Sequence, residues 1–433
     1  MRRLIVFVIA ALSMSQAALR RTDPLSTDLG QVVRGVDNAA AAYGRSAFGA
    51  QRTAAPYTLA DIVNTYNIDP EIWGTYVDGG ATITHLTNES SILLSAPSDG
   101  GIAILQTHSN YRYQAGKGAL VLQTVVPSAA PPPGVTYRWG YFDVLGGLYW
   151  RARFDAGVEF VRRSSIDGGV SETAWRTDAG LNVFGVGSIF EQRFQWLGVG
   201  TVEAFINGRS VAKIEHAGTL PYVYINSATL PVRYEAENLG PVGTVASMKQ
   251  ICASVQSEGG TAPPAFGFSA RRTADLTVGG NATDVPVISV RPKQTFKGLP
   301  NKGALLPIRG WCLSDSKRIR ADIHLRPNTL LGASFVSVNS ESLAEYDEGA
   351  TAYDGGTHIA SFAVSANSQN EVDLGGVLGQ FGELRRRLTT RAFGVVDGGA
   401  AYQTGLDTLV LEVSNPAAGN ATVNCSIDWV EVR

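Results

Sequence analysis

The sequence predicts an all-β protein whose main body is a sandwich of two antiparallel sheets, and three observations carry this prediction. Runs rich in β-branched and aromatic residues follow one another about every 8–15 residues from Tyr57 onward, bounded by Gly, Pro, Asn or Asp. The chain holds 48 glycines in 433 residues, above the usual share of about 7%. Charged residues make up 17%, against about 25% in an average globular protein. Many short strands joined by glycine turns would produce this composition.

The first group of strand-like runs spans residues 57–260 and predicts the larger sandwich. It opens with TLADIVNTY, which reads as a helical turn. The strand-like runs that follow are ATITHLTNESSILLSAP, GIAILQTH, GALVLQTVV, YRWGYFDV, LYWRARF, GVEFVRRSS, FEQRFQW, TVEAFI and YVYINSATLPVRYEAE. Because each is rich in residues that suit a pleated surface, we expect each to form a strand.

One hairpin can be placed to the residue. Asn207-Gly208 stands between TVEAFI and RSVAKI, and Asn-Gly is the strongest two-residue hairpin signal because both turn positions need a positive φ. We expect Ile206 to pair with Arg209. Ala204 would then lie opposite Val211 and give the hairpin a partly apolar face.

Glycine-rich tripeptides predict further turns. Gly198-Val199-Gly200 predicts a bend between FEQRFQW and this hairpin. Asp-Gly-Gly also suits a tight turn, because Asp and Gly tolerate positive φ. It occurs five times, beginning at Asp78, Asp99, Asp167, Asp354 and Asp397. Calcium loops would need carboxylates at regular offsets, and these are absent from the sequence.

The second half of the chain predicts a linker and a second, smaller β-sandwich. Residues 261–283 are rich in Gly, Pro and Ser and are the best candidate for a linker. Residues 284–433 contain another series of strand-like runs: VPVISVRP, ALLPIRGWCL, RIRADIHLRP, ASFVSVN, HIASFAVSA, DTLVLEVS and TVNCSIDWVEV. The last run reaches Arg433 and is expected to pair in a sheet.

Residues 1–56 predict an arm outside both sandwiches. Residues 1–17, MRRLIVFVIAALSMSQA, combine a basic start, an apolar run and small residues at a spacing suited to cleavage, which is the form of a secretory signal. The apolar run is too short to span a bilayer. The remainder shows no sustained period beyond a short helix expected at Val36–Tyr43, so it either stays mobile or lies on a neighbour.

Charge and cysteine content limit the function classes. A formal charge of -2 at pH 7 argues against nucleic-acid binding, which needs a basic face. The local cluster Arg385-Arg386-Arg387 is typical of a solvated face or of salt bridges. Cys252, Cys312 and Cys425 lie far apart and lack the C-x-x-C spacing of zinc sites. We expect three buried apolar cysteines, with one bridge and one free thiol as the alternative.

Common catalytic motifs are absent from the sequence, and no catalytic, cofactor-binding or metal-binding residue is predicted. There is no G-x-S-x-G elbow, no H-E-x-x-H, no Walker loop and no G-x-G-x-x-G after a strand. The histidines are scattered, and each is expected to be a hydrogen-bonded structural residue: His85, His108, His216, His324 and His358.

Paired carboxylates are the remaining catalytic candidates. Glu235 and Glu237 in RYEAE stand two residues apart and therefore share one face of a strand, and Glu191 could share a sheet face with Glu203. A glycoside hydrolase needs two carboxylates about 5–10 Å apart, flanked by rings that stack on sugars. The same alternation equally produces an exposed polar face, so hydrolysis is the weaker alternative.

Aromatic residues could serve a binding site or a core. Rings exposed together on one concave face would indicate a lectin, whereas rings buried between two sheets would stiffen the sandwich. We expect the core for the main set: Trp139, Tyr141, Tyr149, Trp150, Trp175 and Trp196.

Several stretches, taken in order, resemble a group of virion structural proteins of tailed bacteriophages. They are HSNYRYQAGKGALVLQTVV, a Trp/Gly/Phe-Asp strand, FEQRFQWLGVGTVEAFINGRSVAKIEHAG, PYVYINSATLPVRYEAEN, VPVISVRPKQTFKG and EYDEGATAYDGGTHIAS. The resemblance covers residues 57–433. It implies a jelly-roll, concanavalin-like sandwich followed by a smaller β domain, in a non-enzymatic part of the particle without cofactors. The signal-like residues 1–17 depart from this group.

We therefore expect a virion structural protein that is not an enzyme, either a capsid decoration or cement protein or a component of the tail, baseplate or a fibre. It would assemble in several copies, and its partners would be other copies of itself and other virion proteins, contacted through residues 1–56. No nucleic acid and no membrane span are expected. The alternatives are a secreted carbohydrate-binding β-sandwich, if residues 1–17 are removed, and a glycoside hydrolase.

Overall fold

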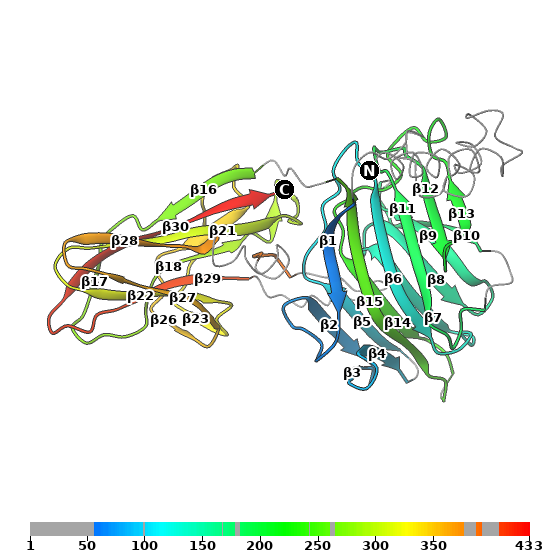
Figure 1. Ribbon diagram of the computed structural model, residues 1–433, viewed down its shortest axis with the longest axis horizontal. Helices are drawn as coiled ribbons and strands as arrows, with labels where there is room; N and C mark the ends of the chain where they lie inside the picture. The colour runs from blue at the N-terminus through cyan, green and yellow to red at the C-terminus, as the bar shows by residue number, and fades with distance from the viewer. Residues whose placement is uncertain are drawn as a thin grey trace, which may run out of the picture. The chain divides into compact units, whose positions relative to one another are not determined.

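The computed structural model describes residues 56–97, 100–166, 168–177, 182–241, 243–259, 265–375, 387–391 and 407–433. Strands make up most of these residues, and they form two separate groups of antiparallel sheets, so the predicted fold class is confirmed (Figure 1). The expected signal at residues 1–17, the helix at Val36–Tyr43 and the first two arginines of Arg385-Arg386-Arg387 lie outside the described residues. Within these residues, no helix has the length and apolar composition needed to cross a bilayer.

The first sandwich consists of an eight-stranded and a seven-stranded sheet. The eight-stranded sheet has the order β13-β12-β11-β6-β15-β4-β3, with β1 also paired to β15. Its strands are β1 (Pro56–Val63), β3 (Thr82–Leu86), β4 (Ser91–Ala96), β6 (Ala119–Pro127), β11 (Ser188–Phe194), β12 (Val202–Ile206), β13 (Arg209–Ile214) and β15 (Ala246–Glu258).

The seven-stranded sheet has the order β10-β9-β8-β7-β14-β5-β2. Its strands are β2 (Trp73–Asp78), β5 (Gly101–Thr107), β7 (Val135–Phe142), β8 (Gly147–Arg153), β9 (Gly157–Ser164), β10 (Ser171–Arg176) and β14 (Val232–Asn238). Strands adjacent in this sheet are far apart in sequence, for example β14 beside β5 and β7, and this is the crossing pattern of a jelly roll.

Large aromatic rings join the two sheets of the first sandwich. Trp139 and Trp150 from the seven-stranded sheet meet Phe190 of β11 edge to face, at centroid distances of 4.8 and 5.3 Å. All three are fully buried. The expectation that the aromatic runs fill a core is therefore confirmed for these residues, and their apolar area is a main source of stability.

The chain enters the first sandwich as a strand, not as a helical turn. Residues 56–63 pair with β15, from Pro56 opposite Glu258 to Val63 opposite Cys252. The predicted helical turn in TLADIVNTY was therefore wrong. Ala60 and Ile62 point into the core, and the pairing that allows this is with a partner almost 200 residues away, which a local pattern does not reveal.

The hairpin at Asn207-Gly208 is confirmed. Both residues have positive φ, 50° and 78°, as a type I′ turn requires. Ile206 pairs with Arg209 as predicted, but a register shift after Ala204 places Ala204 opposite Ala212 and not Val211.

Replacing Gly208 with alanine is expected to destabilise the first sandwich by about 1–2 kcal/mol, because an L side chain resists positive φ. Gly169→Ala is a matched control, since Gly169 has no positive φ and a Cβ there meets no atom within 4 Å. Urea unfolding of the two variants measures the difference. Equal stabilities would contradict the assigned turn.

The predicted glycine turns are confirmed at Asp78 and at Gly198–Gly200. Gly79 and Gly80 have positive φ and form a turn, whereas Gly355 and Gly356 have positive φ but link Asp354 to Thr357 without forming one. Gly198 has a φ of 78°, and a Cβ on Gly200 would lie 1.7 Å from the Gln195 carbonyl oxygen, so the predicted bend there needs glycine. The other Asp-Gly-Gly stretches include residues outside the described part of the chain.

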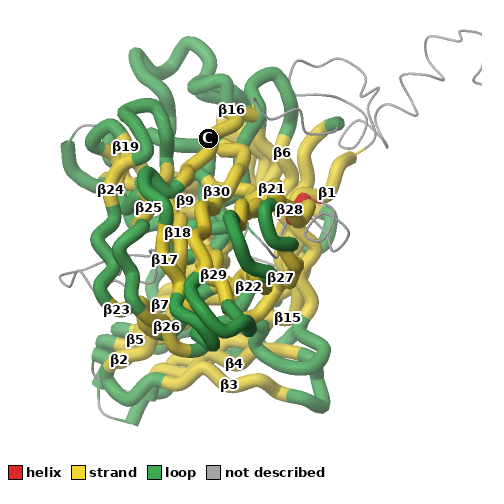
Figure 2. Tube along the Cα trace, turned by 90° about the vertical axis from the view of Figure 1, so that its left-hand side faces the viewer, coloured by secondary structure: helices red, strands yellow, loops and turns green. Residues whose placement is uncertain are grey.

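The second sandwich contains a five-stranded sheet, β16-β30-β21-β28 with β17 paired to β30, and a six-stranded sheet, β24-β25-β18-β29-β22-β27. Figure 2 shows β18, β29, β22 and β27 side by side. The five-stranded sheet comprises β16 (Ala265–Arg271), β17 (Leu276–Val278), β21 (Ala304–Ser314), β28 (Ser368–Asp373) and β30 (Ala421–Val432). The six-stranded sheet comprises β18 (Val285–Pro292), β22 (Ile319–Leu325), β24 (Val336–Ser337), β25 (Ala344–Asp347), β27 (Thr357–Val364) and β29 (Leu409–Ser414).

Two short ribbons accompany the sheets of the second sandwich. They are β19 (Thr295–Phe296) with β20 (Leu299–Pro300), and β23 (Thr329–Leu331) with β26 (Ala352–Asp354).

The segment expected to be a linker belongs to the second sandwich. Within residues 261–283, β16 and β17 both pair with β30, the last strand of the chain. The linker prediction is corrected accordingly. Gly267 and Ser269 lie inside β16 and Gly279-Gly280 follows β17, so the Gly and Ser content of this stretch does not mark a domain boundary.

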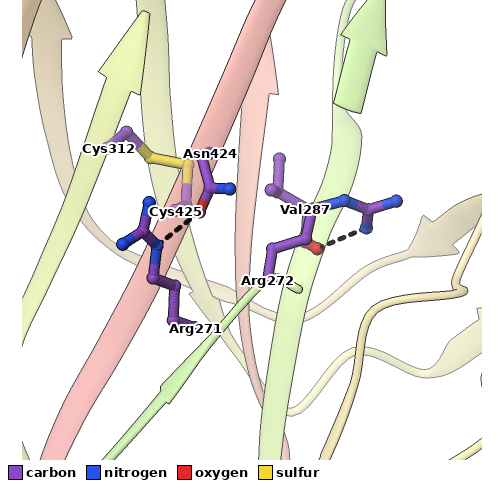
Figure 3. The surroundings of a disulfide bond; sticks show 6 residues. All are labelled: Arg271, Arg272, Val287, Cys312, Asn424 and Cys425. Carbon is purple, nitrogen blue, oxygen red and sulfur yellow. Dashed lines mark hydrogen bonds between the residues drawn. A yellow bond between two sulfur atoms is a disulfide. The ribbon is translucent and has the colours of Figure 1, made fainter. Parts of the chain in front are cut away.

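A disulfide between Cys312 and Cys425 joins the two central strands of the five-stranded sheet (Figure 3). The two residues are direct cross-strand partners on β21 and β30, with Cα atoms 4.1 Å apart, and both are fully buried. Next to the bridge, Arg271 Nε donates to Asn424 Oδ1 (3.1 Å) and Arg272 Nη1 donates to the Val287 carbonyl (3.1 Å). Three apolar cysteines were expected. The structure has one bridge and a half-buried free thiol, Cys252.

Candidate functional site

The outer face of the seven-stranded sheet carries a connected set of arginine and glutamate side chains. Strand alternation sends Tyr137, Trp139, Trp150 and Tyr234 into the core, so their neighbours in sequence point to the opposite face. This outer face is called the charged face below. Its ionic residues are Asp78, Arg138, Arg151, Arg153, Glu159, Arg163, Glu172, Arg176, Arg233, Glu235 and Glu237.

Glu235 and Glu237 lie together on the charged face, as their spacing predicted. Arg138 Nη1 bridges them, at 3.1 Å from Glu235 Oε2 and 2.8 Å from Glu237 Oε2. A second arginine, Arg233, donates from Nε to Glu235 Oε1 at 2.5 Å. The two carboxylates are thus held as acceptors of guanidinium groups.

The electrostatics of Glu235 do not suit a general acid. Burial alone would raise its pKa, but the positive charges of Arg233, Arg138 and Arg163 outweigh burial and lower it to about 2. A glycoside hydrolase needs one carboxyl group whose pKa is raised so that it can donate a proton near neutral pH. We therefore assign Glu235 a structural role.

Glu203 lies on the other sheet and cannot act with Glu235. The register places it opposite Arg193 on β11 and Lys213 on β13. Glu191 faces the same side as Glu203, as predicted, but it is bound by Arg193, whose guanidinium lies 4.1 Å from the ring centroid of Phe205. These two acids belong to a separate ion-pair cluster.

Toward the β10 edge the charged face opens to solvent. Arg151 contacts Glu159 (2.9 Å) and Glu172 (2.5 Å), and Arg163 contacts Glu172 at 2.9 Å. Burial would raise the pKa of Glu172, but a hydrogen bond from Tyr149 and the charge of Arg163 hold it below its ordinary value. Arg153 is 39% exposed and Glu172 28%, so their polar groups can be reached from outside.

Two arginines occupy directly opposite strand positions on the charged face. Arg138 on β7 and Arg151 on β8 are cross-strand partners, and like charges in that position repel. Glu235 and Glu237 beside Arg138, and Glu159 and Glu172 beside Arg151, offset this repulsion. Among the described residues, the buried Nε of Arg138 has no hydrogen-bond partner, so this N–H group could still donate a hydrogen bond.

The aromatic prediction holds for most but not all of its residues. Trp139, Tyr141 and Trp150 are in the core, and Trp175 and Trp196 pack against it while partly exposed. Tyr149 is buried on the other side of the sheet, on the charged face, where its ring stacks on Phe142 at 4.4 Å and Arg163 lies 5.0 Å from its centroid. No pair of Trp or Tyr rings in the described residues is exposed together on this face.

Sequence reasoning expected scattered histidines, but His324 and His358 come together in the second sandwich, with ring centroids 5.1 Å apart. Asp322 and Glu412 lie beside them. The alternation in RADIHL already indicates that Asp322 and His324 share one face of a strand. The sequence does not show which strands pair with it, so Glu412 and His358 could not be predicted as neighbours. Within the described ranges no three His, Cys, Asp or Glu residues are arranged to hold a metal ion.

No protein-family model and no curated protein matches the sequence. Among solved structures, the chain is similar to a GH16 protein of the Bacteroides ovatus mixed linkage glucan PUL, with 8% identity and a TM-score of 0.36, over 46% of this chain and 99% of that one. For an endo-1,3-beta-glucanase from Streptomyces sioyaensis the identity is 10%, the TM-score 0.36 and the two coverages 49% and 99%. For the Emp47p carbohydrate recognition domain the values are 13%, 0.31, 46% and 94%.

These comparisons contradict the prediction that the protein is not an enzyme, and we withdraw it. Glycoside hydrolases and an endo-beta-1,4-glucuronan lyase from Trichoderma reesei stand among the similar structures, so a β-sandwich of this kind gives no ground for excluding catalysis. At such identities and TM-scores the likeness concerns the fold alone, and it assigns no activity or substrate to this chain.

Proposed function

We propose that the protein binds carbohydrate, and that the charged face is the binding surface. The observation that carries this proposal is the opposed pair Arg138 and Arg151, each already bound by carboxylates and placed beside the more exposed Arg153 and Glu172. Sugar hydroxyls both donate and accept hydrogen bonds, so a surface that alternates guanidinium and carboxylate groups offers partners for both.

The charge balance of this face favours an acidic saccharide. Six arginines (138, 151, 153, 163, 176 and 233) stand against four glutamates (159, 172, 235 and 237) and Asp78. A carboxylate or sulfate that reaches Arg138 and Arg151 would accept charge-assisted bonds from both guanidinium groups. A neutral sugar would form weaker, uncharged hydrogen bonds, so we expect it to bind more weakly.

The test is a panel of neutral and acidic oligosaccharides with wild-type protein and the variant Arg151→Gln. We expect an acidic oligosaccharide to bind, its affinity to fall at least about tenfold in the variant, and high salt to weaken it. Arg309→Gln is a matched control, because Arg309 also bridges two acids across strands, Glu371 and Asp428, but in the second sandwich. Absence of binding, or equal binding by Arg151→Gln, would refute the proposal.

A place in a bacteriophage particle stays a prediction, carried by the resemblance of residues 57–433. It is compatible with carbohydrate binding, since a particle can carry a glycan-binding component. Mass spectrometry of purified particles tests it, and a match to this chain in several copies per particle is the expected result. Recovery of the chain solely from a secreted fraction, with residues 1–17 removed, would favour the secreted alternative.

A further inference from the structure

A group of ionisable side chains lies on the outer face of the six-stranded sheet in the second sandwich, and the charged face does not include it. On β22, Ala321 and Ile323 point into the core, so Asp322 and His324 point outward. The register places Asp322 directly opposite Glu412 of β29 on one side and Ser361 of β27 on the other. Two carboxyl groups are therefore cross-strand neighbours.

The two carboxyl groups are both buried but differ in their hydrogen-bond partners. Asp322 is 3% exposed and accepts from Arg320 Nε at 2.6 Å and from the Ser361 hydroxyl, with His358 Nε2 at 3.3 Å. Glu412 is 1% exposed, and among the described residues its Oε2 atom has no hydrogen-bond partner. His324 Nε2 lies 3.4 Å from its other oxygen.

Because of this difference in partners, the pKa values of Asp322 and Glu412 are shifted in opposite directions. Burial would raise the pKa of Asp322, but Ser361 and Arg320 hold it below its ordinary value. Burial raises the pKa of Glu412 to about 7, with the charges of Asp284 and Asp322 adding to this and Tyr353 and Arg320 opposing it. Burial and the neighbouring His358 lower the pKa of His324, which disfavours a compensating positive charge beside Glu412.

The β23–β26 ribbon meets this group through Tyr353. The Tyr353 ring lies 5.1 Å from the His324 ring, and its hydroxyl interacts with the Glu412 carboxyl. Each ribbon strand is three residues long, and within the described part of the chain it pairs with the other one alone, Leu330 opposite Tyr353. So short a two-stranded ribbon has little stability of its own, and contacts such as that of Tyr353 hold it on the sheet.

We propose that Glu412 is a proton-binding site that controls how firmly the β23–β26 ribbon is held on the second sandwich. With the proton bound, the carboxyl is neutral and does not repel Asp322, and the burial of this neutral form outweighs the preference of Tyr353 for the ionised form. Without the proton, a second buried negative charge stands opposite Asp322 and near Asp284. That charge is relieved when the ribbon opens and water reaches Glu412.

The direction of the pH effect follows from proton linkage. Glu412 binds its proton more tightly in the closed state than in an open, hydrated state, where its pKa returns to about 4.3. The stabilisation of the closed state is therefore complete below about pH 4.3 and is lost as the pH rises through about 7. Between these limits one proton changes the opening equilibrium by up to about tenfold per pH unit.

Hydrogen exchange of the ribbon amides tests the proposal. The Asn328 amide, which donates to the Asp354 carbonyl, and the Thr351 amide, which donates to the Leu331 carbonyl, report opening. After correction for intrinsic exchange, we expect their opening constants to rise up to about tenfold per pH unit between pH 5 and 7. In Glu412→Gln, which cannot ionise, the dependence should disappear.

Two further measurements keep the proposal falsifiable if that variant does not fold. Titration of the wild-type protein by carboxyl carbon NMR should show one glutamate that titrates near neutral pH. The control variant Glu345→Gln alters a partly exposed acid on β25, bound to Arg291, and should leave the ribbon profile unchanged. An unchanged slope in Glu412→Gln, no glutamate titrating above pH 6, or a zinc ion bound by this group would each overturn the proposal.

Discussion

Replacing Glu235 with glutamine is expected to lower the free energy of unfolding by about 3–5 kcal/mol, because the change leaves buried guanidinium charge without its partner. Glu235 is 1% exposed and accepts from Arg233, which is fully buried, and from Arg138. Glutamine keeps the size of the side chain but carries no negative charge. The arginines would then stay buried without this negative charge, although Arg138 keeps Glu237 and Arg233 keeps its bond to Gln106 Oε1.

The pH dependence of stability provides an independent check of Glu235. Its pKa of about 2 in the folded protein lies below the value of about 4.3 for an unfolded glutamate. The carboxylate therefore contributes its full stabilisation above about pH 4.3 and loses it as the pH falls toward 2, in total about 3 kcal/mol. Glu235→Gln should lack this part of the acid transition.

Chemical unfolding at pH 7 and pH 3 measures both effects on the first sandwich. Glu203→Gln is the matched control, because Glu203 is a partly exposed acid in a cross-strand ion-pair cluster on the other sheet. We expect a change of about 0.5 kcal/mol or less for this control. If Glu235→Gln cost no more than the control, the pairing of Glu235 with Arg233 and Arg138 would contribute nothing.

Replacing Cys312 and Cys425 together with alanine should destabilise the second sandwich by about 2–5 kcal/mol. The bridge joins residues 113 positions apart, and closure of a loop of about 100 residues in the unfolded chain is worth about 4.7 kcal/mol in the loop-entropy model. The strands β21 and β30 remain paired through their backbone, so the fold should persist with a lower transition temperature.

Calorimetry of the oxidised protein, and of protein whose disulfide was reduced in the unfolded state, separates the effect of the bridge from that of side-chain packing. The double variant and the reduced wild type should show a similar lowering of the transition that belongs to the second sandwich. Cys252→Ala, which removes a half-buried free thiol on β15, should leave that transition in place. A double variant as stable as the oxidised wild type would mean that the bridge does not form.

The strands could be predicted from the sequence because each carries its own signal. Alternation, β-branched and aromatic content and glycine turns are local properties, and they located most of the longer strands and the Asn207-Gly208 hairpin, but not β2, β10, β15 or β28. Two of the errors share one cause. Residues 56–63 and β16 become strands through pairing with β15 and β30, which lie about 160–200 residues away, and no local pattern specifies such a partner.

The candidate sites were less predictable for the same reason. Spacing placed Glu235 and Glu237 on one face, but the arginines that fix their charge come from β7 and from the same strand. The raised pKa of Glu412 could not be predicted from its own segment, LVLEVS. Its surroundings are formed in part by Asp322 and Tyr353, which come from other strands. Cys312 and Cys425 likewise became partners only through the register of β21 and β30.

The pairing of β1 with β15 has a mechanical consequence. Pro56, where the chain enters the first sandwich, is the cross-strand partner of Glu258, close to where the chain leaves it. A pulling force between these two points would act across the strands, along their hydrogen bonds, and would open the ladder one pair at a time from this end. Tension along the chain would therefore separate β1 from β15 before it disrupts the core of the first sandwich. This pair of strands would be the first part of the sandwich to unfold under force.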